Sequence, residues 1–274
     1  MTTNTQLSPA PFVIELNGVN FKELTKDLQK PLDGVFAAAM QSTLRELCRS
    51  IPGCTFGMTE YGRIILCVSG VEAVEKEAYV SLATKLFHQE FRVASENWMI
   101  DEGIRMPMYT LQRDPHFCPS DEVLRLEKVY LSLFDKGEFE ASICTGDTPK
   151  WDIVGLGKVD TRFYLFYRRQ NHALGFYESF YGNGTIPGCP AGCIRGACCY
   201  QVESASVVKD PLPELPLPDW CTPEELEAAR KENVELLEKY PPEVKPNEKP
   251  GMEWVIDLNP PDFRDDKDYV MRWF

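Results

Sequence analysis

The residues from Pro11 to Asp33 read PFVIELNGVNFKELTKDLQKPLD, and the transitions on which the fold depends lie within them. The run PFVIELN is short and apolar, which is typical of a buried strand. Gly18 follows as a turn residue, and a polar loop then leads to Asp33. Asp33 directly precedes a helical pattern and has the chemistry of an N-cap. The segment therefore predicts a strand, a turn, a loop and the start of a helix.

The chain continues with alternating helix and strand patterns. Residues 34–51 carry large apolar side chains every three or four positions, which predicts an amphipathic helix. Residues 63–70 (RIILCVSG) are typical of a buried strand, and residues 75–91 predict a second amphipathic helix. The first 91 residues thus indicate the order strand, helix, strand, helix.

The rest of the chain adds further elements and a different kind of tail. The motif PSDE before residue 123 predicts a helix start, residues 139–146 predict a strand, and Asp160 is placed to cap a long aromatic helix. ACCYQVE, residues 197–203, predicts another strand. Residues 209–220 alternate proline with other residues and predict an extended connector, and TPEE then opens an acidic helix.

Composition excludes several classes of protein. The 274 residues carry a net charge of −13, which fits poorly with a protein that grips nucleic-acid phosphates over its whole surface. The sequence has no apolar run of about 18 residues and no secretory leader, so we expect a cytoplasmic protein without a membrane partner. Reduced thiols are then expected for its ten cysteines.

Several segments resemble, in the same order, the tRNA-His guanylyltransferase family, whose members add a nucleotide in the 3′–5′ direction at a tRNA 5′ end. Residues 13–33 resemble the family's opening R-x-D-G-R-x-F, its loop and its K-P-x-D motif. FEASIC (139–144) resembles F-D-A-R-V-F, and FYRRQNHA (166–173) resembles the W-R-Q-x-D-A helix. The ending DLNPPDFRDDKDY (257–269) resembles D-x-E-x-P-x-F-x-x-D-R-x-Y.

The resemblance implies an α/β (α+β) fold with a palm-like antiparallel sheet and flanking helices. This domain would span residues 1–208, with insertions near 93–137 and 146–160. Residues 209–274 would add the Pro-rich connector, the capped helix and an acidic C-terminal tail packing on the domain. The resemblance also implies a nucleotide such as GTP or ATP and tRNA as partners, and it leaves a protein partner and a homo-oligomer open.

The departures from the family fall on its catalytic chemistry. The family uses carboxylates on neighbouring strands to hold two Mg²⁺ ions, because hard cations require anionic oxygen ligands. The first of these acids falls on Asn17, and the family's S-D-E hairpin falls on Tyr61, Gly62 and Arg63. An asparagine offers only a neutral oxygen, and an arginine repels a cation at close range. The sequence therefore predicts that standard two-metal nucleotidyl transfer is lost.

Two alternatives to this hypothesis remain open from the sequence. In the first, the protein is an active nucleotide-processing enzyme whose Mg²⁺ site is rebuilt from Glu15, Glu60 or Glu140. Glu15 and Asn17 share one side of the strand, so Glu15 with Glu60 could form a relocated metal site; a pair of ordinary surface or ion-paired acids is the favoured interpretation. In the second alternative, the fold serves as a protein-interaction module, which the acidity of the chain favours.

The candidate nucleotide contacts are Lys30 and Asp33, with Gly18, Asn20 and Phe21 at the turn. The resemblance places the K-P-x-D motif beside an incoming nucleotide, where lysine suits a phosphate and aspartate suits a guanine edge. The competing interpretation is that Asp33 caps the following helix and that Lys30 is solvated.

Three side chains on the aromatic helix are further candidates. Arg168 and Arg169 could contact RNA phosphate or a triphosphate, or they could lie on a solvated helix face. His172 has no evident cysteine or carboxylate partner in the sequence and is expected to be a structural histidine.

Four cysteines, Cys189, Cys193, Cys198 and Cys199, lie close together in the sequence. The spacing of the first two would suit zinc, but adjacent residues alternate faces on a strand. Buried thiols are therefore expected.

Overall fold

The computed structural model describes residues 9–28, 33–101, 120–146, 151–181, 196–204 and 245–274. The predicted connector, the acidic helix that follows it, Lys30 and the first two cysteines of the loop lie outside these ranges. Within the described ranges, no helix is both long and apolar enough to cross a membrane.

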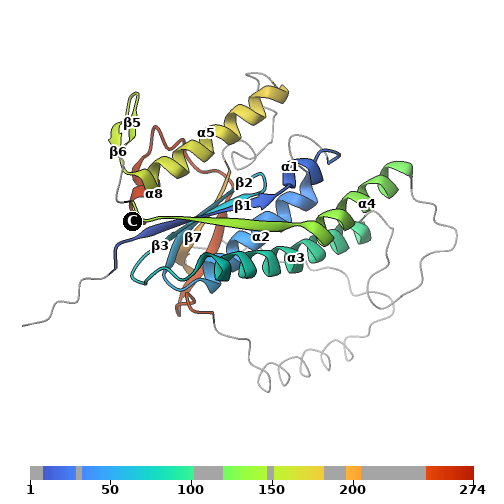
Figure 1. Cartoon of the computed structure of the whole chain (residues 1–274), viewed down its shortest axis with the longest axis horizontal. Coiled ribbons are helices and arrows are strands. Elements are labelled where there is room, and N and C mark those ends of the chain that lie inside the picture. The colour runs from blue at the N-terminus through green and yellow to red at the C-terminus, as the bar shows by residue number, and fades with distance from the viewer. Residues whose placement is uncertain (1–8, 29–32, 102–119, 147–150, 182–195, 205–244) are drawn as a thin grey trace, which may run out of the picture.

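A six-stranded antiparallel sheet forms the centre of the protein, in the order β4-β1-β3-β2-β7-β8 (Figure 1). Its strands are β1 (Phe12–Val19), β2 (Cys54–Glu60), β3 (Arg63–Val68), β4 (Glu138–Cys144), β7 (Ala197–Glu203) and β8 (Met252–Asp257). A separate two-stranded hairpin consists of β5 (Trp151–Ile153) and β6 (Gly157–Val159).

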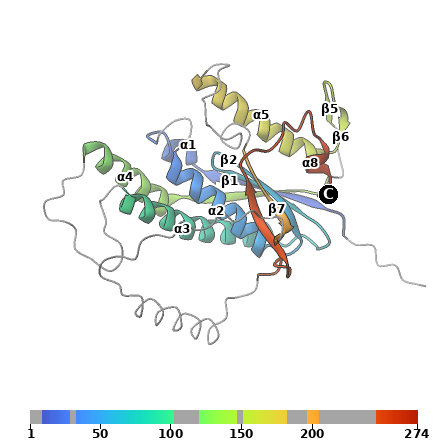
Figure 2. The same ribbon diagram turned by 180° about the vertical axis from the view of Figure 1, so that it is seen from behind.

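The helices cover both faces of the sheet. They are α1 (Phe21–Leu24), α2 (Gly34–Ser50), α3 (Lys76–Asp101), α4 (Asp121–Lys136), α5 (Thr161–Tyr181) and α8 (Asp268–Met271). Helices α2 and α3 lie on one face, with α4 beside α3, and α5 lies on the opposite face with α8 near its start (Figures 1 and 2). The fold is therefore the predicted α+β arrangement of a palm-like antiparallel sheet between helices.

The face toward α2 and α3 is apolar. Side chains alternate along a strand, so Phe12, Ile14 and Leu16 of β1 point to this face. They are buried in one cluster with Phe36 of α2 and Phe87 of α3. Burial of each large side chain typically stabilises a fold by about 1.5–3 kcal/mol. This layer therefore supplies a large part of the driving force for folding.

The face toward α5 has a second apolar cluster that ends partway along the sheet. Val13 of β1 and Phe56 of β2 pack there against Phe166 of α5. Phe263 and Val270, from the C-terminal segment, complete this cluster and are fully buried. The C-terminal residues therefore belong to the core of the sheet domain as well as supplying its edge strand, β8.

Most of the predicted elements are confirmed. The strands at β1, β3, β4 and β7 and the helices at α2, α4 and α5 lie where the patterns indicate. Helix α3 continues past the predicted end at residue 91, because the sequence up to Asp101 contains no glycine or proline to end it. Strands β2 and β8 and the β5–β6 hairpin were not predicted.

A tight turn joins β2 to β3. Tyr61 and Gly62 both have positive φ, +29° and +81°, as a two-residue hairpin turn requires. The N–H of Gly18 donates to the Gly62 carbonyl at 2.8 Å, which ties the end of β1 to this turn. The Phe21 ring packs directly beneath, so a Cβ on Gly62 would lie 2.8 Å from its Cδ2 atom.

Gly62→Ala should destabilise the protein, because alanine at positive φ costs about 1–2 kcal/mol and its methyl group also meets Phe21. We expect a lower urea midpoint for this variant. The matched control is Gly34→Ala in the first turn of α2, where a new Cβ meets no atom within 4 Å. Equal midpoints for the two variants would contradict the role assigned to the turn.

Candidate functional site

A row of polar side chains crosses four neighbouring strands at the end of the α5 face. Asn17 of β1 is the register partner of Glu140 on β4 and of Arg63 on β3. Arg63 is in turn the partner of Glu60 on β2. Facing residues of paired strands share a side of the sheet, so these four side chains form one line. We call it the polar row.

Arg63 is the central cation of the polar row. Its Nε donates to Asn17 Oδ1 at 3.0 Å, and its Nη1 lies 3.7 Å from Glu60 Oε2. The Glu60 side chain is only 3% exposed, whereas that of Arg63 is 33% exposed. A buried carboxylate requires a compensating charge, and Arg63 supplies one for Glu60.

His172 of α5 contacts the polar row from the helix that covers this face of the sheet. Its Nδ1 lies 2.8 Å from Glu60 Oε1, and its side chain is half exposed. His172 is therefore hydrogen-bonded, as expected of a structural histidine, and its partner is a carboxylate that was not evident in the sequence. The partner lies on a strand far away in the sequence, and only the fold brings the two together.

Glu15 and Arg169 form a buried ion pair one step further along the same face. The Arg169 Nε donates to Glu15 Oε1 at 2.7 Å, and an Nη2 contact to the same oxygen makes a second bond. Both side chains are at most 10% exposed. Arg169 is therefore buried rather than on a solvated helix face, whereas its neighbour Arg168 is exposed.

The residues of this face do not fit the metal ions that the family resemblance implies. The Asn17 oxygen already accepts a hydrogen bond from Arg63, and a guanidinium so close repels a divalent cation. Glu15 is taken by Arg169, and Glu60 lies between Arg63 and His172. Across the described ranges, no three His, Cys, Asp or Glu side chains are grouped to hold a metal ion.

The residues predicted to contact a nucleotide lie near the start of α2. Asp33 is buried and caps α2 by accepting from the Phe36 N–H at 3.0 Å, as the competing interpretation had it. Its carboxylate also accepts from the Tyr130 hydroxyl of α4, at 3.0 and 3.2 Å. Phe21 is a core residue, whereas Asn20 is exposed in a left-handed conformation with φ of 58°.

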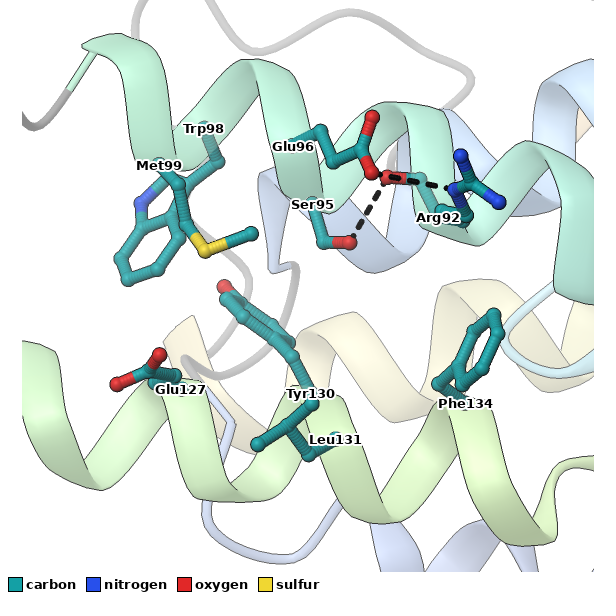
Figure 3. Close-up of a pocket in the computed structure, with 9 residues that line it drawn as sticks. All are labelled: Arg92, Ser95, Glu96, Trp98, Met99, Glu127, Tyr130, Leu131 and Phe134. Carbon is teal, nitrogen blue, oxygen red and sulfur yellow. Dashed lines mark hydrogen bonds and ion pairs between the residues drawn. The ribbon is translucent and has the colours of Figure 1, made fainter. Parts of the chain in front are cut away.

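A groove of about 260 Å³ lies between α3 and α4 (Figure 3). These two helices lie on the side of the sheet opposite to α5 (Figures 1 and 2). Trp98 from α3 and Tyr130 from α4 point into it and meet edge to face, with ring centroids 5.0 Å apart. An Arg92–Glu96 ion pair lies on its rim. All of its lining residues except Arg92 belong to the predicted insertion near residues 93–137, and the groove is separate from the polar row.

The described part of the cysteine cluster consists of buried thiols. Cys198 and Cys199 belong to the two different apolar clusters and so point to opposite faces of β7, as predicted from their adjacency. Burial raises the pKa of the Cys198 thiol well above its usual value. Such a thiol is a poor nucleophile and a poor metal ligand.

Arg169→Met should strongly destabilise the protein, because it leaves the Glu15 carboxylate buried without a cation; we expect a loss of about 3–5 kcal/mol in the free energy of unfolding. Removing both charges with Glu15→Leu and Arg169→Met should restore most of this loss. Urea denaturation measures the cycle, and Arg92→Met at the exposed pair on α3 is the control, with a change below about 1 kcal/mol. A double variant no more stable than Arg169→Met would contradict the assignment.

The architecture is similar to that of solved proteins, although the sequence itself has no match. No protein-family model and no curated protein matches the sequence. A solved bacterial tRNA(His) guanylyltransferase-like protein in complex with GTP matches the structure with a TM-score of 0.53 at 14% identity, covering 97% of this chain and 90% of that one. Its complex with ATP matches with a TM-score of 0.51 at 13% identity, covering 97% and 91%. The chain therefore has the fold of bacterial tRNA(His) guanylyltransferase-like proteins.

Proposed function

We propose that this protein binds nucleotides, and tRNA or another RNA, without divalent metal ions and without the two-metal nucleotidyl transfer of the proteins it resembles. The observation that carries the proposal is the position of Arg63. It stands where the resemblance calls for a metal-binding hairpin, and it donates to Asn17 Oδ1, the side chain that replaces the first acid.

A fixed guanidinium supplies part of what a metal ion supplies at such a position. It carries a permanent positive charge, and its planar donors match phosphate oxygens. It cannot lower the pKa of an attacking hydroxyl in the way that a bound divalent cation does. The proposal therefore keeps phosphate recognition and removes the activation of a nucleophile.

The proposed ligand class rests on the shared fold and on the charge of this face. The similar solved structures hold GTP and ATP. In this chain Glu15 and Glu60 are both buried beside arginine side chains, so neither carboxylate presents an unpaired charge to an approaching phosphate. Arg63 is partly exposed, and Arg168 is exposed.

The active-enzyme alternative requires Glu15, Glu60 or Glu140 to bind Mg²⁺. With Glu15 or Glu60 as the ligand, Arg169 or Arg63 would have to leave its carboxylate, and each departure would uncover a buried charge. The interaction-module alternative has the net charge of −13 in its favour, and absence of nucleotide binding would support it.

No guanylyltransferase activity is expected on tRNA-His. Incubation with labelled GTP, ATP, Mg²⁺ and tRNA should leave the 5′ end unextended, because Asn17 and Arg63 replace acids that metal ions require. An active guanylyltransferase run in parallel shows that the assay works. Incorporation above a no-protein control would contradict the loss of nucleotidyl transfer.

Nucleotide binding should be weak and nearly independent of Mg²⁺. Without metal, the attraction comes from charge-assisted hydrogen bonds of about 1.5–3 kcal/mol each. Calorimetric titration of GTP and ATP, with Mg²⁺ and with EDTA, should give dissociation constants within about threefold of each other, a difference below about 1 kcal/mol. Tight binding that EDTA abolishes would instead support a rebuilt metal site.

A further inference from the structure

The Glu60 carboxylate joins two basic side chains that come from different layers of the fold. One of its oxygens meets His172 Nδ1 at 2.8 Å, and the other lies 3.7 Å from the Nη1 of Arg63. Glu60 itself is buried, while both of its partners reach solvent. A buried anion thus fixes the positions of two side chains at the surface.

The contact with Glu60 determines which nitrogen His172 presents. A carboxylate accepts hydrogen bonds, so the proton lies on Nδ1 and the ring is oriented by it. The imidazole is half exposed, and Nε2 is the ring nitrogen that remains for a ligand. Arg168 lies one helical turn earlier on α5 and is also exposed, so the two side chains share one flank of the helix.

We propose that Arg63, Arg168 and His172 form a metal-free site for a terminal phosphate group, with Glu60 as the positioning residue. The inference rests on the proposed function and adds the side chains that would carry it. Two guanidinium groups supply hydrogen-bond donors from a strand and a helix, which suits a tetrahedral anion. His172 gives its Nδ1–H to Glu60, so it adds a donor at Nε2 in its protonated, imidazolium form. The same cations would repel a divalent metal ion.

An acidic side chain near this site distinguishes phosphate binding from metal binding. Glu140 is exposed on β4, at the end of the polar row beside Asn17. Its negative charge repels a phosphate but would attract a metal ion. Removing this charge therefore has opposite effects on the two kinds of site.

The experiment titrates the full chain with ATP and with inorganic tripolyphosphate in EDTA. His172→Gln keeps a hydrogen-bond donor for Glu60, and Arg168→Gln changes an exposed residue, so both variants should keep the native melting temperature. Each is expected to weaken binding about tenfold, whereas Glu140→Gln should strengthen it about threefold. Arg92→Gln, on α3 at the opposite face, makes the same change of charge and should leave binding unchanged.

Competition then identifies the source of the phosphate. Displacement of bound ATP by tripolyphosphate shows that the triphosphate alone is recognised, as on a free nucleotide, and displacement only by a 5′-phosphorylated RNA oligonucleotide, compared with its dephosphorylated form, assigns the site to an RNA end. Failure of both competitors would overturn the site.

The remaining outcomes separate the site from the proposed function. If the wild type binds ATP but His172→Gln and Arg168→Gln bind it equally well, this site is overturned and the proposed function stands. If Glu140→Gln weakens a binding that requires Mg²⁺, a metal site is present and both are overturned. Absence of any wild-type binding overturns the proposed function and, with it, this site.

Discussion

A carboxylate removed from water must find a cation or hydrogen-bond donors, and this requirement organises the α5 face of the sheet. Glu15 and Glu60 are both buried there, and an uncompensated buried charge would cost several kcal/mol. Arg169 meets the first, and Arg63 with His172 meets the second. Two of these three bases come from α5. The position of that helix and the charge compensation of the two buried carboxylates therefore depend on each other.

The fold was largely predictable because its apolar patterns are local. The buried strands around Ile14 and Ile65 and the helices after Asp33 and Ser120 are marked by periodicity and capping chemistry within a few residues. Strand β2 was not predicted, although Phe56 and Met58 alternate with Thr55, Gly57 and Thr59 at the two-residue period of a strand. Strand β8 was also not predicted. It is recognised from its antiparallel pairing with β7, which the sequence alone does not reveal.

The site was less predictable because its contacts join distant parts of the chain. The resemblance singled out Asn17 and Arg63 as departures from the family's motifs, but their mutual hydrogen bond depends on strand register. The pairing of Glu60 with His172 spans 112 positions in the sequence, so no local pattern could indicate it. The three-residue spacing of Arg169 and His172 on α5, beside two unassigned acids on strands, was the one signal available.

The backbone geometry of the hairpin that carries Arg63 does not depend on the charge of the side chain at its tip. Gly18 and Gly62 leave room for the Phe21 ring, and that ring contacts Phe36, Phe87 and Phe139 of the main apolar layer. The geometry of the turn is therefore enforced from the hydrophobic core, whichever side chains stand at its tip. A hairpin positioned in this way can change the charge that it presents without losing its place.

An arginine side chain also differs from a bound metal ion in how it can be replaced. Arg63 is present at every concentration of salt, nucleotide or chelator, since no binding equilibrium governs it. An acid reintroduced at position 17 alone would be neutralised by Arg63, and loss of Arg63 alone would leave Glu60 without its nearest guanidinium. Metal binding at this position would therefore require at least two coordinated substitutions, because each single substitution gives a less stable protein or one that still lacks a metal site.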